Sequence, residues 1–399
     1  MYNQKGNTLL WVIIAILAIV GIVYFTTQKP AEDTTTDDVA VEKQEIPGDT
    51  LKIGLIMPMT GDAAVYGENE SRAATIAADE INAAGGVNGK TIELLIEDGK
   101  CDGEGGAAAA NKLIGVDGVK YIVGGACSGE TLGFVAIAAE NMVLSISPSA
   151  TSPDITTAGD FVFRTSPSDA LAGLIAAEYA YEDLAATTAA VVYETTDYAQ
   201  ALASTFKTNF EAAGGTVAIF EGFNTGDTDV TSQVLKIQAQ NPGVIYIVPQ
   251  TPASGALVLK QLKATSATGK IIASEVMASD TILNDYKDEM EGVTAIEPFF
   301  DQGAAEASAF LESYRTTYGA APEFPFFAAS AYSDVYLIAE AIEAVGYDTK
   351  ATARYLTSLT DWTGALGTIS FDQFGDVVTS YLIKTATAGT FPSGTIVAP

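Results

Sequence analysis

The chain has 399 residues, of which 48% are hydrophobic and 18% are charged, a composition typical of a globular protein. Its 50 acidic and 20 basic residues give a formal net charge of −30, which argues against nucleic acid or an anionic membrane surface as a partner. Because the chain has no histidine, Ser-His-Asp catalysis, imidazole bases and His-ligated metal sites are excluded.

The first element is a long apolar segment near the N-terminus. Residues 8–25 carry no charge, and as a helix they would extend about 27 Å, close to the roughly 30 Å of a bilayer core. A cleaved signal peptide is the alternative, but its apolar region is usually about 7 to 15 residues long and ends at small residues. We predict an uncleaved transmembrane anchor within residues 1–30, in the lipid bilayer through residues 8–25, with the following domain on the extracytoplasmic side.

An acidic segment follows the anchor. Residues 31–50 hold seven acidic residues and one lysine without apolar periodicity. Such a segment predicts a solvated linker, so we expect the folded chain to begin near Leu51.

From there, short apolar runs alternate with amphipathic stretches. The runs predict strands at residues 52–56, 91–97, 121–123, 142–146, 189–193, 216–221, 244–248, 270–273, 292–296, 368–371 and 380–384. The stretches predict helices at residues 68–84, 106–115, 129–139, 171–181, 198–213, 231–241, 255–264, 305–318 and 332–345. This alternation predicts a doubly wound α/β fold, and the length favours two lobes. Ligands of such folds bind outside the carboxyl ends of the strands.

Two glycine-rich segments look like nucleotide-binding motifs. Residues 84–91 (AGGVNGKT) lack the first glycine of a P-loop and stand between a helix and a strand, the reverse of the required order. Gly103, Gly105 and Ala108 form a G-x-G-x-x-A pattern in a suitable context, but no acidic residue ends the next strand. We therefore expect no nucleotide cofactor.

Several phrases of the sequence, in this order, resemble the type I periplasmic binding protein family, in its branched-chain amino-acid (Leu/Ile/Val) receptor branch. They include IGLIMPMTGDAAVYGENE, AADEINAAGGVNGKTIELLIED, ISPSATSP, DYAQALASTFKTNFEAAGGTV and AYSDVYLIAEAI. The resemblance implies two α/β lobes, joined by three hinge crossings, with an interlobe ligand cleft. It implies lobe 1 at residues 51–169 plus 299–379, and lobe 2 at residues 170–298 plus 380–399.

Serine and threonine residues follow two neighbouring predicted strands. Ser128 and Thr151 stand where hydroxyls and free main-chain N–H groups could hold an anion. Both could instead be ordinary helix caps or turn residues. The resemblance assigns these two, together with Ser149, to a site that binds the carboxylate of an amino acid.

The resemblance also implies the rest of the pocket. It makes Glu275 the carboxylate that binds the ligand's ammonium group, although a glutamate in so acidic a chain could be an ordinary surface residue. Tyr66, Tyr198 and Phe327 match aromatic pocket positions of the family. Gln250 stands close to the position of a tyrosine in the branched-chain receptors, and would favour a somewhat larger or more polar ligand than leucine.

Cys101 and Cys127 are too few for a four-thiolate metal cluster. By themselves they could form a disulfide or remain small core residues. The resemblance implies a disulfide, because the branched-chain receptors carry one at these places. A disulfide requires an oxidising compartment, which agrees with export.

The sequence therefore predicts the extracytoplasmic solute-binding protein of an ABC importer. It would capture a branched-chain or similar amino acid and deliver it to the permease subunits in the membrane. Alternatives are a ligand-sensing ectodomain of the same fold, or a binder of an amide, urea or an aromatic acid. A carboxylate-pair glycosidase is disfavoured, because no constellation singles out a pair among so many acidic residues. We expect no catalytic residues, metal or cofactor.

Overall fold

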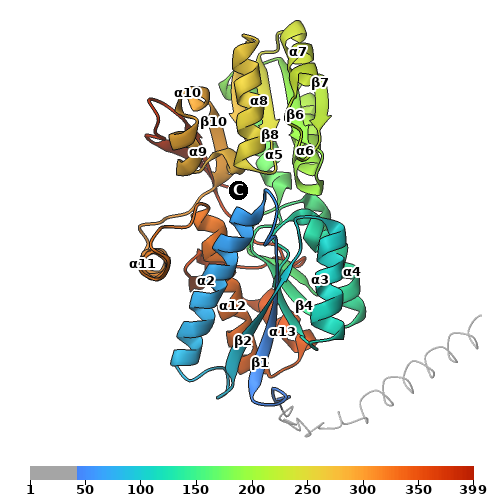
Figure 1. The fold of residues 1–399 in the computed structure, drawn as a ribbon, viewed down its shortest axis with the longest axis vertical. Coiled ribbons are helices and arrows are strands. Elements are labelled where there is room, and N and C mark those ends of the chain that lie inside the picture. The colour runs from blue at the N-terminus through green and yellow to red at the C-terminus, as the bar shows by residue number, and fades with distance from the viewer. Residues whose placement is uncertain (1–42) are drawn as a thin grey trace, which may run out of the picture. The chain divides into compact units, whose positions relative to one another are not determined.

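The computed structural model describes residues 43–399, which form one compact unit with two α/β lobes (Figure 1). The predicted membrane segment at residues 8–25, and residues 31–42 of the predicted linker, lie outside the described residues. Among residues 43–399, no helix combines the length and the apolar character needed to cross a bilayer.

Lobe 1 contains a five-stranded parallel sheet in the order β2-β1-β3-β4-β5. Its strands are β1 (Thr50–Met57), β2 (Thr91–Asp98), β3 (Tyr121–Gly124), β4 (Leu144–Ser147) and β5 (Val162–Arg164). Helices α2 (Ala64–Ala83) and α12 (Pro325–Val345) pack on one face, and α3 (Gly103–Gly115) and α4 (Ser128–Glu140) on the other (Figure 1). Strands β3 and β4 are buried throughout; β3 is apolar along its length, whereas β4 (LSIS) includes the buried serines Ser145 and Ser147.

Lobe 2 contains a seven-stranded sheet in the order β14-β13-β10-β9-β8-β6-β7, antiparallel only at β13 and β14. Its strands are β6 (Thr188–Glu194), β7 (Thr216–Phe223), β8 (Val244–Val248), β9 (Lys270–Ala273), β10 (Thr294–Pro298), β13 (Tyr381–Thr385) and β14 (Gly394–Val397). Helices α5 (Asp169–Glu178) and α6 (Asp197–Ala212) cover one face, and α7 (Thr231–Gln240) and α8 (Pro252–Ala264) the other. Successive residues of β6, Val191 and Val192, point into opposite cores, as expected for a strand between two helical layers.

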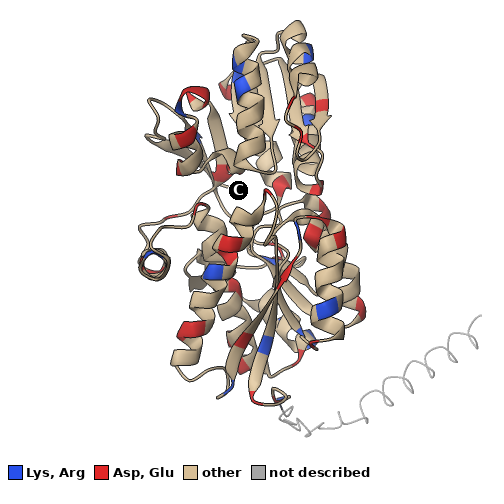
Figure 2. Ribbon diagram, viewed as in Figure 1, with Lys and Arg blue, Asp and Glu red and all other residues tan. Residues whose placement is uncertain are grey.

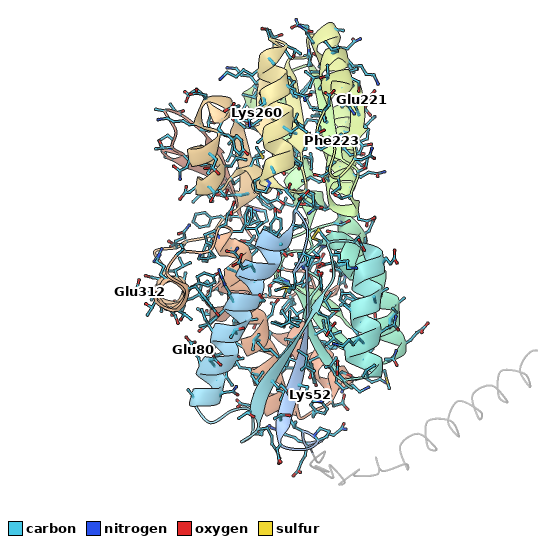
Figure 3. The ribbon with its side chains drawn as sticks, viewed as in Figure 1. Lys52, Glu80, Glu221, Phe223, Lys260 and Glu312 are labelled. Carbon is cyan, nitrogen blue, oxygen red and sulfur yellow. A yellow bond between two sulfur atoms is a disulfide. The ribbon has the colours of Figure 1, made fainter. Side chains whose placement is uncertain are left out.

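The remaining elements are short or peripheral. They are α9 (Asp280–Asp285), α10 (Lys287–Met290), α11 (Ala305–Tyr318), α13 (Thr349–Ser358), a hairpin of β11 (Trp362–Gly364) and β12 (Gly367–Ile369), the 3-10 turns Pro153–Thr157 and Glu275–Met277, and the π turn Tyr179–Asp183. Side chains fill the space between sheets and helices in both lobes (Figure 3), and acidic residues are distributed over both (Figure 2).

The two lobes share one topology. The parallel strands β7-β6-β8-β9-β10 repeat the order of the lobe 1 sheet, so the direction of winding reverses between β1 and β3 and again between β6 and β8. Ligands bind beside the carboxyl ends of strands at such switch points. Within residues 43–399 the chain passes between lobes three times: from β5 to α5, from β10 to α11, and from β12 to β13.

The predicted strands and helices all occur, in the predicted order, with local differences. Helix α12 begins at Pro325 rather than residue 332, because proline suits the first helical turn. The strand predicted from residue 142 begins at Leu144, because Met142 has a φ of 51° and lies in a turn. Ile46 is buried in the lobe 1 core, so the packed chain begins before Leu51. Strands β5, β11 and β14 and helices α9, α10 and α13 were not predicted.

The glycine-rich segments have structural roles. Gly86 has a φ of +70°, and a Cβ there would lie 2.1 Å from the carbonyl oxygen of Lys90, so residues 84–91 form a tight turn. A Cβ on Gly106 would lie 2.3 Å from the carbonyl oxygen of Glu130. Glycine at this position lets α3 pack directly against α4.

Candidate functional site

One cavity between the lobes brings together seven of the eight ligand-binding residues predicted from the sequence. Lobe 1 contributes Tyr66, Ser128, Ser149 and Phe327, and lobe 2 contributes Tyr198, Gln250 and Glu275. Its enclosed free volume is about 20 Å³, enough for about one water molecule, so the two lobes lie almost closed on each other here. The cavity lies at the carboxyl ends of both sheets.

The lobe 1 side of the cavity includes the N-terminus of α4, where main-chain N–H groups and the helix dipole favour an anion. Ser128 is the first residue of this helix and is buried. Its Oγ accepts a hydrogen bond from the N–H of Ser152 at 3.1 Å. Because the hydroxyl proton is not used in that bond, Ser128 can donate it to a ligand oxygen.

The other two predicted hydroxyls are already donating. The hydroxyl of Ser149 donates to the carbonyl oxygen of Ala126 at 2.8 Å. A hydroxyl has one proton, so Ser149 can offer a ligand an acceptor but no donor. Thr151 does not line the cavity, and its hydroxyl donates to Asp169 at 2.7 Å. The structure thus leaves Ser128 as the hydroxyl donor among these three residues.

On the lobe 2 side of the cavity, Glu275 contributes a carboxyl group. It begins the 3-10 turn after β9, and the residue is only 8% exposed. Burial raises the pKa of Glu275 to about 7, while the neighbouring Tyr198 hydroxyl acts in the opposite direction. The ion pairs formed within residues 43–399 do not include Glu275. A buried carboxylate without a cationic partner is the natural complement of a ligand's ammonium group.

Aromatic side chains form much of the remaining wall. The ring of Tyr66 stacks on Phe324 with centroids 4.6 Å apart, and Phe327 belongs to the same buried cluster. The hydroxyl of Tyr66 donates to the carbonyl oxygen of Gln250 at 3.3 Å and so connects the two lobes. This wall is apolar along its faces and polar at one edge, which suits an amphipathic ligand.

The disulfide is confirmed: Cys101 and Cys127 are bonded, with their Cα atoms 5.1 Å apart. Cys127 lines the cavity and caps α4. Beneath the disulfide, the carboxylate of Glu130 accepts hydrogen bonds from the N–H groups of Cys101 at 2.8 Å and Cys127 at 3.1 Å. Burial nevertheless raises the pKa of Glu130 to about 8. This residue fixes the loops after β2 and β3 beside the ligand site.

Glu194 has a similar supporting role in lobe 2 and was not singled out from the sequence. It ends β6 and is 1% exposed. Its Oε2 accepts hydrogen bonds from the N–H of Gln250 at 2.8 Å and from the hydroxyl of Ser254 at 2.6 Å, and its Oε1 accepts one from Thr225 at 2.7 Å. The sequence feature that could have pointed to Glu194 is its position as an acidic residue at the end of an apolar strand.

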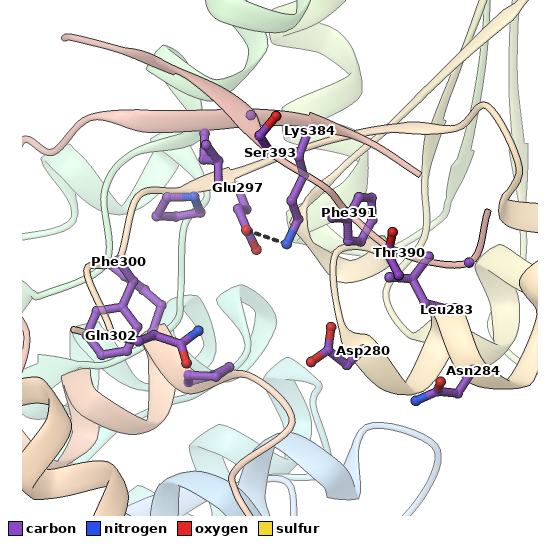
Figure 4. Close-up of a pocket in the computed structure, with 16 residues that line it drawn as sticks. Asp280, Leu283, Asn284, Glu297, Phe300, Gln302, Lys384, Thr390, Phe391 and Ser393 are labelled. Atoms are coloured by element: carbon purple, nitrogen blue, oxygen red, sulfur yellow. Dashed lines mark ion pairs between the residues drawn. The ribbon is translucent and has the colours of Figure 1, made fainter. Parts of the chain in front are cut away.

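A second space, which we call the outer hollow, adjoins the cavity and shares Glu275 and Phe327 with it. Lys384 lies at its lobe 2 side, where Nζ is 2.6 Å from Glu297 Oε1. Figure 4 shows a neighbouring pocket that shares these two residues, and there Nζ of Lys384 lies 4.3 Å from the ring centre of Phe391. The charged residues that line the outer hollow are Glu68, Arg72, Glu275, Asp280, Glu297, Arg315, Glu323 and Lys384. Acidic residues outnumber basic ones, so the approach to the cavity favours a cationic group.

Known proteins are similar to this chain along most of its length. The sequence profile of the periplasmic binding protein family matches residues 50–389. A leucine-, isoleucine-, valine-, threonine- and alanine-binding protein of Pseudomonas aeruginosa is 34% identical over 333 residues, which cover 82% of this chain and 87% of that protein.

Two solved structures are similar in fold and sequence. A leucine-binding protein from Thermotoga maritima has a TM-score of 0.80 and 28% identity, over 88% of this chain and 99% of the other. A branched-chain amino acid transporter substrate-binding protein from Streptococcus pneumoniae, in complex with isoleucine, has a TM-score of 0.79 and 29% identity, over 88% and 100% of the two chains.

Proposed function

This chain belongs to the periplasmic binding protein family, a family of binders rather than enzymes, and from that premise we propose that it is the solute-binding protein of an ABC importer that captures an amino acid. The observation that carries the proposal is the buried, unpaired carboxyl group of Glu275, which faces the same cavity as the donor hydroxyl of Ser128. An amino acid in water has one anionic and one cationic group, and both must find partners when water is removed.

The proposed ligand is bound by both lobes at once. Its carboxylate accepts hydrogen bonds from the Ser128 hydroxyl and from N–H groups at the start of α4. Its ammonium group pairs with Glu275 and donates to the Ser149 oxygen. Its side chain extends toward Tyr66, Tyr198, Gln250 and Phe327. The resemblance placed Ser149 in the carboxylate site, whereas in the proposed orientation its oxygen faces the ammonium group, because its hydroxyl proton is donated to Ala126.

Such two-sided binding couples ligand capture to lobe closure. A ligand held by both lobes stabilises the closed arrangement by its differential affinity for it. Hydrogen bonds from Tyr66 to Gln250 at 3.3 Å and from Ser279 to Glu323 at 3.2 Å already join the lobes. The closed form would then be the one that the permease subunits recognise and unload.

The ligand class and the location rest on further support. The relative from Pseudomonas aeruginosa binds aliphatic amino acids and threonine by its name, and the Streptococcus pneumoniae structure contains isoleucine. The Cys101–Cys127 disulfide fits an oxidising, extracytoplasmic compartment. An amino acid is favoured over an aromatic acid because the latter has no cation for Glu275.

A thermal-shift screen of the full-length chain, purified in mild detergent, tests the proposal. The twenty common amino acids are compared with urea, acetamide and benzoate. At a hundred times its Kd, a specific ligand adds about 2.7 kcal/mol to the free energy of unfolding. We expect at least one amino acid, and none of the other compounds, to raise the melting temperature, and the ligand to be recovered unchanged. A shift by benzoate or urea alone would contradict the proposal.

A further inference from the structure

Gln250 is held at the cavity by hydrogen bonds of its main chain, and its side chain makes none of them. Both hydrogen bonds of this residue within residues 43–399 use its main chain: the N–H donates to Glu194 at 2.8 Å, and the carbonyl accepts from Tyr66 at 3.3 Å. Gln250 is 9% exposed and lines the cavity. Its carboxamide therefore presents one unused donor group and one unused acceptor to the cavity.

A second polar group in the same cavity also lacks a partner. The hydroxyl oxygen of Tyr198 is fully buried and lies close to Glu275 and Ser274, but it has no hydrogen bond of normal geometry within residues 43–399. Tyr198 and Gln250 follow the neighbouring strands β6 and β8, at the switch point of the lobe 2 sheet. The neighbouring lining residues Tyr66, Phe327 and Val276 contribute mainly apolar surface.

Unpaired polar groups in a ligand site select against ligands that cannot pair with them. A purely aliphatic side chain in this cavity would cover the Gln250 carboxamide and give it no hydrogen bond, which reduces affinity by roughly tenfold to a hundredfold. A site that hydrogen-bonds a hydroxyl or amide rejects the analogue without it much more strongly than an apolar site rejects an added hydroxyl.

We propose that the preferred ligand is an amino acid whose side chain carries a hydroxyl or carboxamide group, of the threonine or asparagine type, bound through the Gln250 carboxamide. This inference rests on the proposed function and adds the substrate class within it. The enclosed free volume of about 20 Å³ is smaller than such a side chain, so the ligand enters while the lobes are apart and is enclosed as they close around it. Gln250 is thereby a residue that determines specificity, whereas Glu275 and Ser128 recognise the groups common to all amino acids.

Two pairs of amino acids of nearly equal shape test the proposal in the unaltered protein. Threonine differs from valine by a hydroxyl in place of a methyl group, and asparagine replaces the branched end of leucine by a carboxamide. Calorimetry of the full-length chain should show at least one polar member binding tenfold or more tightly than its aliphatic counterpart. Equal or tighter binding of both valine and leucine would overturn the inference and leave amino-acid binding intact.

A substitution at Gln250 tests whether this residue causes the preference for polar side chains. Gln250→Leu keeps a branched side chain that is one bond shorter than glutamine and removes its hydrogen-bonding groups, so the ratio of polar to aliphatic affinity should fall at least tenfold. Gln240→Leu, at the exposed end of α7, is the matched control and should leave the ratio unchanged. An unchanged ratio in Gln250→Leu would contradict the role of this residue. Failure of every amino acid to bind the unaltered chain would instead refute the proposed function itself.

Discussion

The guanidinium group of Arg164 forms a two-point ion pair with the carboxylate of Asp376, with Nε 2.7 Å from Oδ1 and Nη2 2.6 Å from Oδ2. Arg164 is fully buried and also donates to the carbonyl oxygen of Ser152 at 2.8 Å. Asp376 lies in the chain segment that returns from lobe 1 to lobe 2. The pair therefore connects a hinge crossing to the loop that carries Ser149.

Removing one partner of this pair should destabilise the protein strongly. Asp376→Ala leaves a buried, uncompensated guanidinium group, and we expect a loss of about 3 to 5 kcal/mol in the free energy of unfolding. Lys207→Ala is a suitable control, because it breaks an exposed pair with Glu211 and should cost less than about 1 kcal/mol. Urea denaturation of both variants measures the difference, and similar small losses would show that the buried pair is not needed.

Glu275→Gln should weaken amino-acid binding without unfolding the protein. The substitution keeps the shape and one acceptor but removes the charge that pairs with the ammonium group. We expect a loss of about 2 to 5 kcal/mol, or some thirtyfold to several thousandfold in affinity. Calorimetry with the amino acid found in the screen measures it. Glu343→Gln, an exposed acid of α12, is the control. A change in affinity of less than threefold would show that Glu275 does not bind the ammonium group.

The same variant should be more stable than the unaltered protein at alkaline pH. Burial raises the pKa of Glu275 from 4.5 to about 7, so ionisation of this group costs folding free energy above pH 7. That cost decreases as the pH falls from 7 to 4.5 and is absent below 4.5, where the group is protonated in both folded and unfolded states. Denaturation without ligand should show Glu275→Gln stabilised, on the order of 2 to 3 kcal/mol at pH 8, and no advantage near pH 4.5. A variant destabilised at pH 8 would contradict the cause assigned to this pKa.

Binding affinity should depend on pH through Glu275. An ammonium ligand pairs with the ionised carboxylate, and below a pKa of about 7 the unliganded protein holds it protonated. We expect affinity to be constant above pH 8 and to fall by up to tenfold per unit below pH 7. Calorimetry at pH 5 to 8, in two buffers of different ionisation enthalpy, should also detect proton release at pH 6. The dependence should vanish in Glu275→Gln, and a flat profile in the unaltered protein would be inconsistent with this pairing.

The disulfide should contribute to stability through the unfolded chain. Cys101 and Cys127 are separated by 26 positions, and closing a loop of that length contributes about 3 to 4 kcal/mol in the chain-entropy model. The double variant Cys101→Ser, Cys127→Ser should lose this amount in chemical denaturation. Thiol labelling of the unaltered, denatured protein should find no free cysteine without reductant, and stoichiometric labelling would refute the bond.

The main elements of the fold were readable from the sequence because strands buried on both faces have continuous apolar runs, as in Val244–Val248. The short elements could not be predicted from the sequence, because a short strand or helix is stable only when it packs against neighbouring elements. Val162–Arg164 has three residues and exists as a strand only beside β4. The start of α12 at Pro325 was also missed, since the two phenylalanines after it do not reveal helical periodicity by themselves.

Seven of the eight residues that the resemblance implied for the pocket line the cavity, but the resemblance did not give the direction of their hydrogen bonds. Ser149 and Ser128 both line the cavity, yet one hydroxyl donates to a carbonyl oxygen and the other accepts from an N–H group. Glu194, which holds Gln250, lies 56 positions away from it. No local pattern reports such a contact, because it depends on the order of β6 and β8 in the sheet.

Local composition and periodicity are enough to predict the alternation of strands and helices, the acidic character and the positions of Glu275 and Gln250 after their strands. The burial of Glu275 without a cationic partner, the rise of its pKa to about 7 and the lack of a hydrogen-bond partner for the Gln250 carboxamide follow from the tertiary structure instead. Burial and pairing are properties of the space between two lobes. That space is formed by residues far apart in the chain, and it exists only after both sheets have folded.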